Sequence, residues 1–337
     1  MQEAAFYDRG KHNNVVCRLC CQRCLIREGK RGKCGVRENQ EGTLYSLVYG
    51  RLIANNSDPV EKKPLFHFQP GSRSWSVSTV GCNFHCLHCQ NAEISQYPHL
   101  YGGRIPGEEV TAEEVIRDAL RAECSSISYT YVEPTIFYEF ARDCATLARE
   151  QGLKNIFVSN GYMTPEVNRQ LARILDGINI DLKSFREETY KDICGGSLQP
   201  VLDNIRLLSG LGVWVEVTTL VIPGLNDSPG ELREIAAFLK SIDPAIPWHV
   251  TAFYPSYKMT DRPPTSTETL ARARETGLKE GLRFVYTGNI PGSGGESTWC
   301  PSCGGQLILR RGYSIRENRI QEGQCPDCRE TIEGEWQ

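Results

Sequence analysis

Three cysteines in one short loop constrain this chain more than any other feature. Cys82, Cys86 and Cys89 stand at the spacing C-x3-C-x2-C, and the apolar run 75–80 before them predicts a buried strand. Three thiolates suit a [4Fe–4S] cluster, whose iron is held by cysteine. Because such clusters usually take four cysteines, three leave one iron without a protein ligand. An open metal position indicates a reactive site rather than a structural one, as it does for zinc.

A zinc knuckle or three unrelated core thiols is the alternative interpretation of this loop. The strand before the loop and the motifs farther along the chain favour the cluster.

Length and charge narrow the class of protein. The 337 residues are enough for one large α/β domain with small additions. No apolar run approaches a membrane span, and the first ten residues lack the apolar core of a signal peptide, so we expect a cytoplasmic protein. Acidic residues number 41 and basic ones 38, which argues against non-specific binding of nucleic acid.

The 15 cysteines are distributed in a way that indicates metal ligation. Their total is odd and most are grouped at short spacings, which a disulfide framework would not require. The isolated Cys124, Cys144 and Cys194 lie in predicted helices or loops, and we expect them to be core thiols.

The N-terminal group could form a site of four thiolates from Cys17, Cys20, Cys24 and Cys34. Structural zinc and an auxiliary iron–sulfur cluster both fit this set, and a cysteine-rich loop without metal is a third interpretation. Cys21 is left over as a free thiol.

The C-terminal group consists of two C-x2-C pairs about twenty residues apart. Cys300, Cys303, Cys325 and Cys328 predict a rubredoxin-like zinc ribbon. The Gly-rich segment 291–295 before it is expected to be a flexible linker. We expect the ribbon to cap the preceding domain or to contact a partner.

Strand and helix patterns alternate between these two groups. Thr111-x-x-Glu114 and Thr265-x-x-Glu268 have the form of capping boxes. Alternating strands and helices predict a parallel sheet with right-handed crossovers. About six such units fit a partial (β/α)6 barrel, although a full barrel or an open sheet is also compatible. The predicted strands are 75–80, 126–131, 155–159, 177–182, 213–221, 249–253 and 283–286.

We expect three parts: a cysteine-rich region in residues 1–70, a barrel in residues 71–292 and a zinc ribbon in residues 293–337. In parallel barrels the chemistry gathers at the C-terminal ends of the strands. Polar side chains at or after these ends are expected to form a site together, although any one of them alone could be a turn residue. They are Glu133, Asn160, Asp181, Lys183 and Tyr257.

The cysteine loop resembles that of the radical S-adenosylmethionine (SAM) superfamily, with His88 in the place of the usual aromatic residue. The resemblance implies that the open iron binds the amino and carboxylate groups of SAM. One electron then cleaves SAM to methionine and a 5′-deoxyadenosyl radical, which takes hydrogen from a substrate.

The resemblance extends to the subgroup of pyruvate formate-lyase activating enzyme and, over nearly the whole chain, to the radical SAM component of the AmmeMemoRadiSam system. The motifs that carry it are Cys17-Arg-Leu-Cys20, Ser46-Leu-Val-Tyr-Gly50, Gly81-Cys-Asn-Phe-His-Cys86, Tyr129-Thr-Tyr-Val-Glu-Pro-Thr135 and Asp181-Leu-Lys183, with the terminal cysteine pairs.

By this resemblance, Glu133 belongs to the segment that holds the SAM amino group, although Tyr131 replaces a glycine there. Asp181 and Lys183 would contact the ribose and carboxylate of SAM, and the segment 220–227 would contact its adenine. Tyr257 lies near the position at which the activating enzymes have a histidine that contacts SAM. The implied partners are an electron donor such as flavodoxin or ferredoxin and a Memo-like protein.

Three functions remain open at this point. The first is an oxidoreductase of the radical SAM type that acts on an unidentified substrate. The second is a glycyl-radical enzyme activase, although the eight-iron ferredoxin insert common in activases is missing between Asn91 and Thr111. The third is a zinc-ribbon binding module without catalysis.

Overall fold

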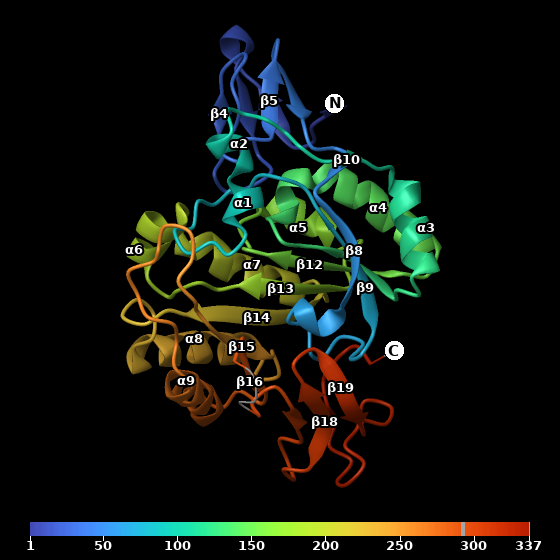
Figure 1. Cartoon of the computed structure of the whole chain (residues 1–337), viewed down its shortest axis with the longest axis vertical. Coiled ribbons are helices and arrows are strands. Elements are labelled where there is room, and N and C mark those ends of the chain that lie inside the picture. Colours follow the sequence, from blue (N-terminus) through green and yellow to red (C-terminus); the bar gives the residue numbers. More distant parts are fainter. Residues whose placement is uncertain (291–293, 337) are drawn as a thin grey trace.

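An eight-stranded sheet forms the centre of the molecule (Figure 1). The computed structural model describes residues 1–290 and 294–336, so residues 291–293 of the predicted linker lie outside the described residues. The seven predicted strands are confirmed, each end within two residues. In order across the sheet, the strands are β8 (Ala54–Pro59), β9 (Arg73–Ser78), β11 (Ser126–Tyr129), β12 (Lys154–Ser159), β13 (Gly177–Asp181), β14 (Trp214–Val221), β15 (Trp248–Ala252) and β16 (Val285–Gly288).

Seven of these strands, β9 to β16, are parallel, and β8 pairs antiparallel with β9 at one edge. Since strand order equals chain order, right-handed crossovers place the connecting helices on one face of the sheet. Within the described residues no pairing joins β8 to β16, so the mixed sheet is open and a full barrel is excluded. The helices are α3 (Ala112–Arg121), α4 (Tyr138–Glu150), α5 (Pro165–Leu171), α7 (Leu198–Gly210), α8 (Pro229–Ile242) and α9 (Thr267–Glu280), with the short α1 (Ala92–Ser95), α2 (Tyr97–Leu100) and α6 (Glu187–Thr189).

One predicted capping box is confirmed and the other is wrong. Thr111 caps α3 in a reciprocal box with Glu114. Helix α9 instead begins after Ser266, whose hydroxyl accepts from the Thr269 amide. The Thr265 hydroxyl instead donates to the carbonyl of Val221, the last residue of β14, and accepts from the Phe253 amide just after β15, which is why it does not cap the helix. None of the helices in the described ranges has the length and apolarity needed to cross a membrane.

The segment 60–70 fills one end of the sheet face opposite the helices. Asn179 of β13 donates to the Pro64 carbonyl at 2.7 Å. The buried Glu216 of β14 accepts from the amides of Phe66 at 3.0 Å and His67 at 2.8 Å. The stretch 45–70 therefore contributes both the edge strand β8 and this filling segment.

The N-terminal region consists of two small antiparallel sheets at the top of Figure 1. A buried ion pair of 2.7 Å between Arg37 and Glu139 joins it to α4. Both side chains are only 2% exposed, so removing either partner would leave an unpaired buried charge. The two sheets comprise β1 (Gln2–Glu3), β6 (Thr43–Ser46) and β5 (Arg37–Gln40), and β2 (Tyr7–Arg9), β3 (Val15–Cys17) and β4 (Leu25–Ile26); β7 (Arg51–Leu52) pairs with β10 (Glu108–Glu109).

The C-terminal region contains β17 (Thr298–Trp299), β18 (Gln306–Arg311) and β19 (Ser314–Asn318) at the bottom of Figure 1. The buried Arg310 donates to the Phe66 carbonyl at 2.6 Å, and its guanidinium lies 4.3 Å from the centre of the Phe66 ring. Phe66 and Tyr286 share one apolar cluster with this region. The region therefore caps the sheet at the end filled by segment 60–70, away from the C-terminal strand ends.

His67 is expected to make this end of the molecule sensitive to acid. Its Nδ1 contacts the Glu333 carbonyl at 2.6 Å and its Nε2 contacts the Tyr286 hydroxyl at 2.6 Å, which fits a neutral ring. Burial lowers the pKa of His67 from 6.5 to about 4. Between these values the unfolded chain binds the proton and the folded chain does not, so stability falls as the pH decreases through this window, by up to about 3 kcal/mol.

Urea unfolding of wild type and His67→Asn across this pH window measures the effect. The variant should lose this contribution to the acid-side slope, whereas His12→Asn, at an exposed position, should keep it. Equal slopes for wild type and His67→Asn would contradict the assignment.

Candidate functional site

The cysteine loop follows β9 directly and lies at the C-terminal edge of the sheet. The His85 amide donates to the Cys194 carbonyl at 2.8 Å and the Leu87 amide to the Ile193 carbonyl at 3.0 Å, so the loop is held by its backbone. Burial raises the pKa of the Cys89 thiol and raises that of Cys82 well above its usual range. Thiolates are therefore unfavourable here unless a cation accompanies them, which fits a metal centre.

The three thiols of this loop are spread too widely for a zinc knuckle. Four thiolates around one zinc ion lie about 3.8 Å apart, given Zn–S bonds of about 2.3 Å. Across residues 1–290 and 294–336, the C-terminal cysteines form the one group of three or more ligand side chains whose ligand atoms all lie within 4.8 Å of one another. Cys82, Cys86 and Cys89 do not form such a group, whereas a cluster puts each thiolate on a different iron.

Glu133 joins the C-terminal ends of β11 and β12. Its carboxylate accepts from the Ser159 hydroxyl at 2.9 Å and from the amides of Asn160 at 2.7 Å and Thr135 at 3.1 Å. Burial raises the pKa of Glu133, and these donors oppose that effect. The carboxylate is thus occupied within the protein and positions the loops around it.

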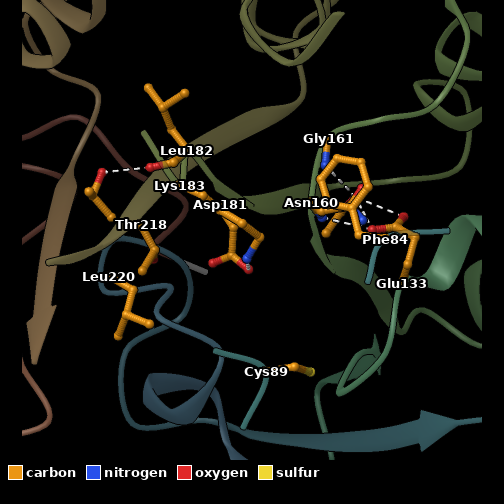
Figure 2. Close-up of polar contacts among 12 residues, drawn as sticks. Phe84, Cys89, Glu133, Asn160, Gly161, Asp181, Leu182, Lys183, Thr218 and Leu220 are labelled. Carbon is orange, nitrogen blue, oxygen red and sulfur yellow. Dashed lines mark hydrogen bonds and ion pairs between the residues drawn. The ribbon is translucent and has the colours of Figure 1, made fainter. Parts of the chain in front are cut away.

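Asn160 connects these strand ends to the cysteine loop. Its side-chain amide donates to Asn83 Oδ1 at 2.7 Å, and Asn83 directly follows Cys82. Figure 2 shows Asn160 beside Glu133, whose carboxylate accepts from the Asn160 backbone amide. The hydrogen bonds place the predicted Glu133 and Asn160 beside the first cysteine of the loop.

Asp181 and Lys183 project from the end of β13 toward the loop that carries Cys89 (Figure 2). Lys183 Nζ lies 2.9 Å from Asp181 Oδ2, and the lysine side chain is 15% exposed against 37% for the aspartate. Burial alone would lower the pKa of Lys183, but Asp181 and the nearby thiols raise it well above its usual range. The ammonium therefore stays charged close to the cysteine loop.

Tyr257 lies in a loop whose residues before and after it both contact the cysteine loop. The Ser256 hydroxyl donates to the Cys89 carbonyl at 3.2 Å, and the Lys258 amide donates to the Leu87 carbonyl at 3.0 Å. Tyr257 itself is half-buried. The predicted residues from β11, β12, β13 and the segment after β15 thus surround one loop.

The segment 220–227 is held by its own side chains. Asn226, fully buried, donates to the carbonyls of Lys183 at 2.8 Å and Leu220 at 2.9 Å. Asp227 accepts from the Gly224 amide at 2.9 Å and so closes its own turn. Sequence reasoning did not single out Asn226, although its place at a strand end was a signal for it.

Two further residues near the loop make contacts that the sequence did not predict. Cys194 is buried, as expected of a core thiol. Its thiol also lies against that of Cys86, a contact that no sequence motif predicts. Tyr131 has φ +67°, the left-handed conformation that a glycine adopts freely. Its hydroxyl bonds to Asp58 and its ring lies 4.7 Å from Lys63 Nζ, contacts that offset a backbone cost of about 1–2 kcal/mol.

Comparisons with known proteins bear on this site. Residues 76–239 match the family described as the radical SAM superfamily. An uncharacterized protein of Methanocaldococcus jannaschii is 44% identical over 336 residues, which cover 99% of this chain and 99% of that protein. The chain belongs to the radical SAM superfamily. Membership in this enzyme superfamily excludes a binding module without catalysis.

Two more similarities agree with this radical SAM assignment. The pyruvate formate-lyase-activating enzyme of Clostridium pasteurianum is 26% identical over 179 residues, covering 51% of this chain and 71% of that enzyme. The structure of Streptococcus suis SuiB bound to S-adenosylmethionine superposes with a TM-score of 0.51 at 14% identity, over 68% of this chain and 53% of that one. The second similarity concerns the fold alone.

The superfamily implies a [4Fe–4S] cluster and SAM, and the residues present fit both. Three thiols on one loop, with Cys86 buried and the other two half-buried, suit the cluster. The ion pair of Asp181 and Lys183 beside them offers acceptors and a cation. His88, which stands where the superfamily usually has an aromatic residue, stays neutral because burial lowers its pKa to about 3.

The C-terminal cysteines of this radical SAM chain are compatible with a zinc ribbon. Sγ of Cys300 lies 3.6 Å from that of Cys328, and Sγ of Cys303 lies 3.7 Å from that of Cys325. These separations suit four thiolates around one ion. The four N-terminal cysteines line a cavity beside Asn83 instead.

Cys300→Ser is expected to release about one zinc ion per chain and to lower the thermal midpoint, because structural zinc contributes folding free energy directly. Elemental analysis and thermal unfolding measure both effects. Ser302→Ala, in the same turn, serves as the matched control and should keep the metal. Unchanged zinc in Cys300→Ser would refute the ribbon assignment.

Proposed function

We propose that this radical SAM enzyme cleaves SAM reductively and uses the 5′-deoxyadenosyl radical to take hydrogen from a substrate. The cluster bound by Cys82, Cys86 and Cys89 would supply the electron and the open iron for this chemistry. The observation that carries the proposal is that a charged lysine, only 15% exposed, and its paired carboxylate lie beside a loop of three thiols.

Each side chain at the site has a role in this proposal. Lys183 donates to the SAM carboxylate as a point charge, and Asp181, which is more exposed, accepts from the ribose hydroxyls. Asn160 and Tyr257 complete the SAM site from the neighbouring loops. Glu133 acts as a positioning residue through Ser159 and Asn160.

We also propose the finer organisation of the chain. Residues 71–292 form a partial (β/α)6 barrel, between a cysteine-rich region in residues 1–70 and a zinc ribbon in residues 293–337. The resemblance to the AmmeMemoRadiSam system supports a Memo-like partner protein, and the need for one electron per SAM supports a flavodoxin or ferredoxin as donor. A cytoplasmic location agrees with such a donor.

A second candidate is activation of a glycyl-radical enzyme, favoured by the similarity to a pyruvate formate-lyase-activating enzyme. That similarity covers 51% of this chain, so much of the chain lies outside the aligned part. Incubating the enzyme with SAM and the Memo-like protein or a glycyl-radical enzyme distinguishes the two. A glycyl radical in the second partner would favour the activase.

The variant Cys82→Ala/Cys86→Ala/Cys89→Ala tests the proposed function. It should form no 5′-deoxyadenosine from SAM under dithionite, because the irons lose their thiolates. Chromatography of the anaerobic reaction measures the product. Cys144→Ala, which changes a buried cysteine in α4, should cleave SAM like wild type. If the triple variant still produced 5′-deoxyadenosine, the proposal would be wrong.

Lys183→Ala should weaken SAM binding by roughly 1.5–3 kcal/mol, the contribution of a charge-assisted hydrogen bond. Calorimetric titration of SAM into the reconstituted protein measures this. Lys154→Ala is the matched control, because it breaks another Asp–Lys pair, in which Lys154 Nζ lies 3.2 Å from Asp176 Oδ1. That pair lies at the N-terminal ends of the strands, away from the cysteine loop. Reduced stability with normal SAM affinity in Lys183→Ala would show that the ion pair only supports the fold.

A further inference from the structure

We infer that Cys17, Cys20, Cys24 and Cys34 hold a second, fully ligated [4Fe–4S] cluster, which takes electrons from an acidic one-electron carrier and passes them to the SAM-binding cluster. This inference rests on the proposed function for its second half only. The metal assignment stands on the N-terminal site itself.

The four thiols converge on one place. Cys17, Cys20, Cys24 and Cys34 all line a single cavity, together with apolar side chains such as Leu19 and Ile26. Cys17 and Cys34 are buried, and Cys20 and Cys24 are half-buried. Cys21, between them in the sequence, turns away and donates to the Met163 carbonyl at 3.3 Å. Four thiols around one cavity, with the fifth excluded, define a ligand set.

The spacing of these thiols distinguishes a cluster from zinc. The C-terminal cysteines of the same chain show what a set suited to zinc looks like, with all four sulfurs within 4.8 Å. No three of the N-terminal cysteines form such a group in the part of the chain that the structure describes. Any three of these sulfurs therefore include a pair more than 4.8 Å apart, against about 3.8 Å between thiolates around one zinc ion. A four-iron cluster suits the wider spacing, because each thiolate binds a different iron.

Two buried donors face the same cavity without partners. Arg37 and Asn83 both line it, and each residue is 1% exposed. Arg37 Nε and Asn83 Nδ2 have no hydrogen-bond acceptor among the described residues. A buried unsatisfied donor costs about 1–3 kcal/mol, so an acceptor is expected in the cavity. The sulfurs of an iron–sulfur cluster are such acceptors, and N–H donors to them set the reduction potential.

The N-terminal site is packed against the loop of the SAM-binding cluster. Gly81, which precedes Cys82, has φ +97°, and a Cβ there would come within 2.7 Å of the Cys34 carbonyl oxygen. Gln22 Nε2 donates to the Asn83 carbonyl at 2.9 Å and to the Gly195 carbonyl at 2.8 Å. Backbone contact between the two cysteine segments suits electron transfer between their clusters.

The outer side of the site carries positive charge. Arg23, Arg27 and Lys30 are exposed in the segment around Cys24, where the exposed Glu28 is the one acidic residue between positions 21 and 33, in a chain whose net charge is −3. Leu25, 65% exposed, adds an apolar contact among them. A basic surface with an apolar centre complements a small acidic carrier such as a flavodoxin or ferredoxin and would speed its association.

The electron balance is simple. The reduced carrier loses one electron and the N-terminal cluster gains it. That cluster then returns to its oxidised state as the electron moves to the cluster at Cys82, Cys86 and Cys89, where SAM consumes it. No iron of the N-terminal cluster is open, so it binds no substrate.

The metal content of the wild-type protein tests the assignment without any variant. Anaerobically reconstituted protein should contain about eight irons, about eight sulfides and about one zinc per chain. The reduced protein should give two paramagnetic resonance signals, of which SAM changes one. About four irons with two zinc ions, or a single signal that responds entirely to SAM, would overturn the inference.

Variants then assign the second signal to its residues. Cys82→Ala/Cys86→Ala/Cys89→Ala should keep about four irons and a signal that SAM does not change. Adding Cys20→Ala and Cys34→Ala to this triple variant should remove the remaining irons and the remaining signal. Adding Cys21→Ala instead should leave both in place. Iron that survives loss of Cys20 and Cys34 would refute the ligand set. A failure of SAM cleavage in wild type would instead concern the proposed function.

The carrier test uses Cys20→Ala/Cys34→Ala with the SAM-binding cluster intact. Its SAM cleavage should stay near wild type with dithionite and fall strongly with reduced flavodoxin. Arg23→Glu/Arg27→Glu, which leaves all ligands in place, should show the same carrier-specific loss while keeping wild-type iron. Equal losses with both reductants would show that the N-terminal site only supports the fold, and unchanged rates with flavodoxin would place electron entry elsewhere.

Discussion

The parallel order of β9 to β16 places all their C-terminal ends on one edge, and the chemistry of the molecule depends on this constraint. A loop that follows any of these strands lies next to loops from its neighbours. The cysteine loop leaves the first of them, and Asp181 with Lys183 leaves the fourth strand of the parallel series. Residues nearly a hundred positions apart thereby come to share one site without any motif that joins them.

Buried amides hold this edge together. Asn160 connects the end of β12 to Asn83 of the cysteine loop, and Asn226 connects the ends of β13 and β14. Each amide both donates and accepts, so it can satisfy backbone groups that loops leave unpaired. These contacts also explain why Glu133 faces inward to Ser159 and Asn160 and leaves the open surface to Asp181.

Other parts of the chain cover the opposite edge of the sheet. Segment 60–70 brings backbone amides to Glu216, and the C-terminal region covers this segment with Arg310. His249 Nε2 lies 2.6 Å from Glu216 Oε2. Such buried polar networks are stable only when their groups are paired, which accounts for the tight joint between regions far apart in the sequence. The two cysteine-rich regions thus lie at different ends, one beside the site and one away from it.

The sequence by itself predicted the parallel strands, the cysteine loop and the grouping of the C-terminal cysteines. Strand periodicity and short Cys spacings are local, so residues such as Cys82 and Cys300 could be assigned without knowing their neighbours. Only the tertiary structure decided that β8 closes one edge, that Thr265 bonds between strand ends and that Cys194 meets Cys86. It also decided that Arg37 and Asn83 face the N-terminal cysteines. These contacts join segments through packing and hydrogen bonds across long separations, and nothing periodic in the chain encodes them.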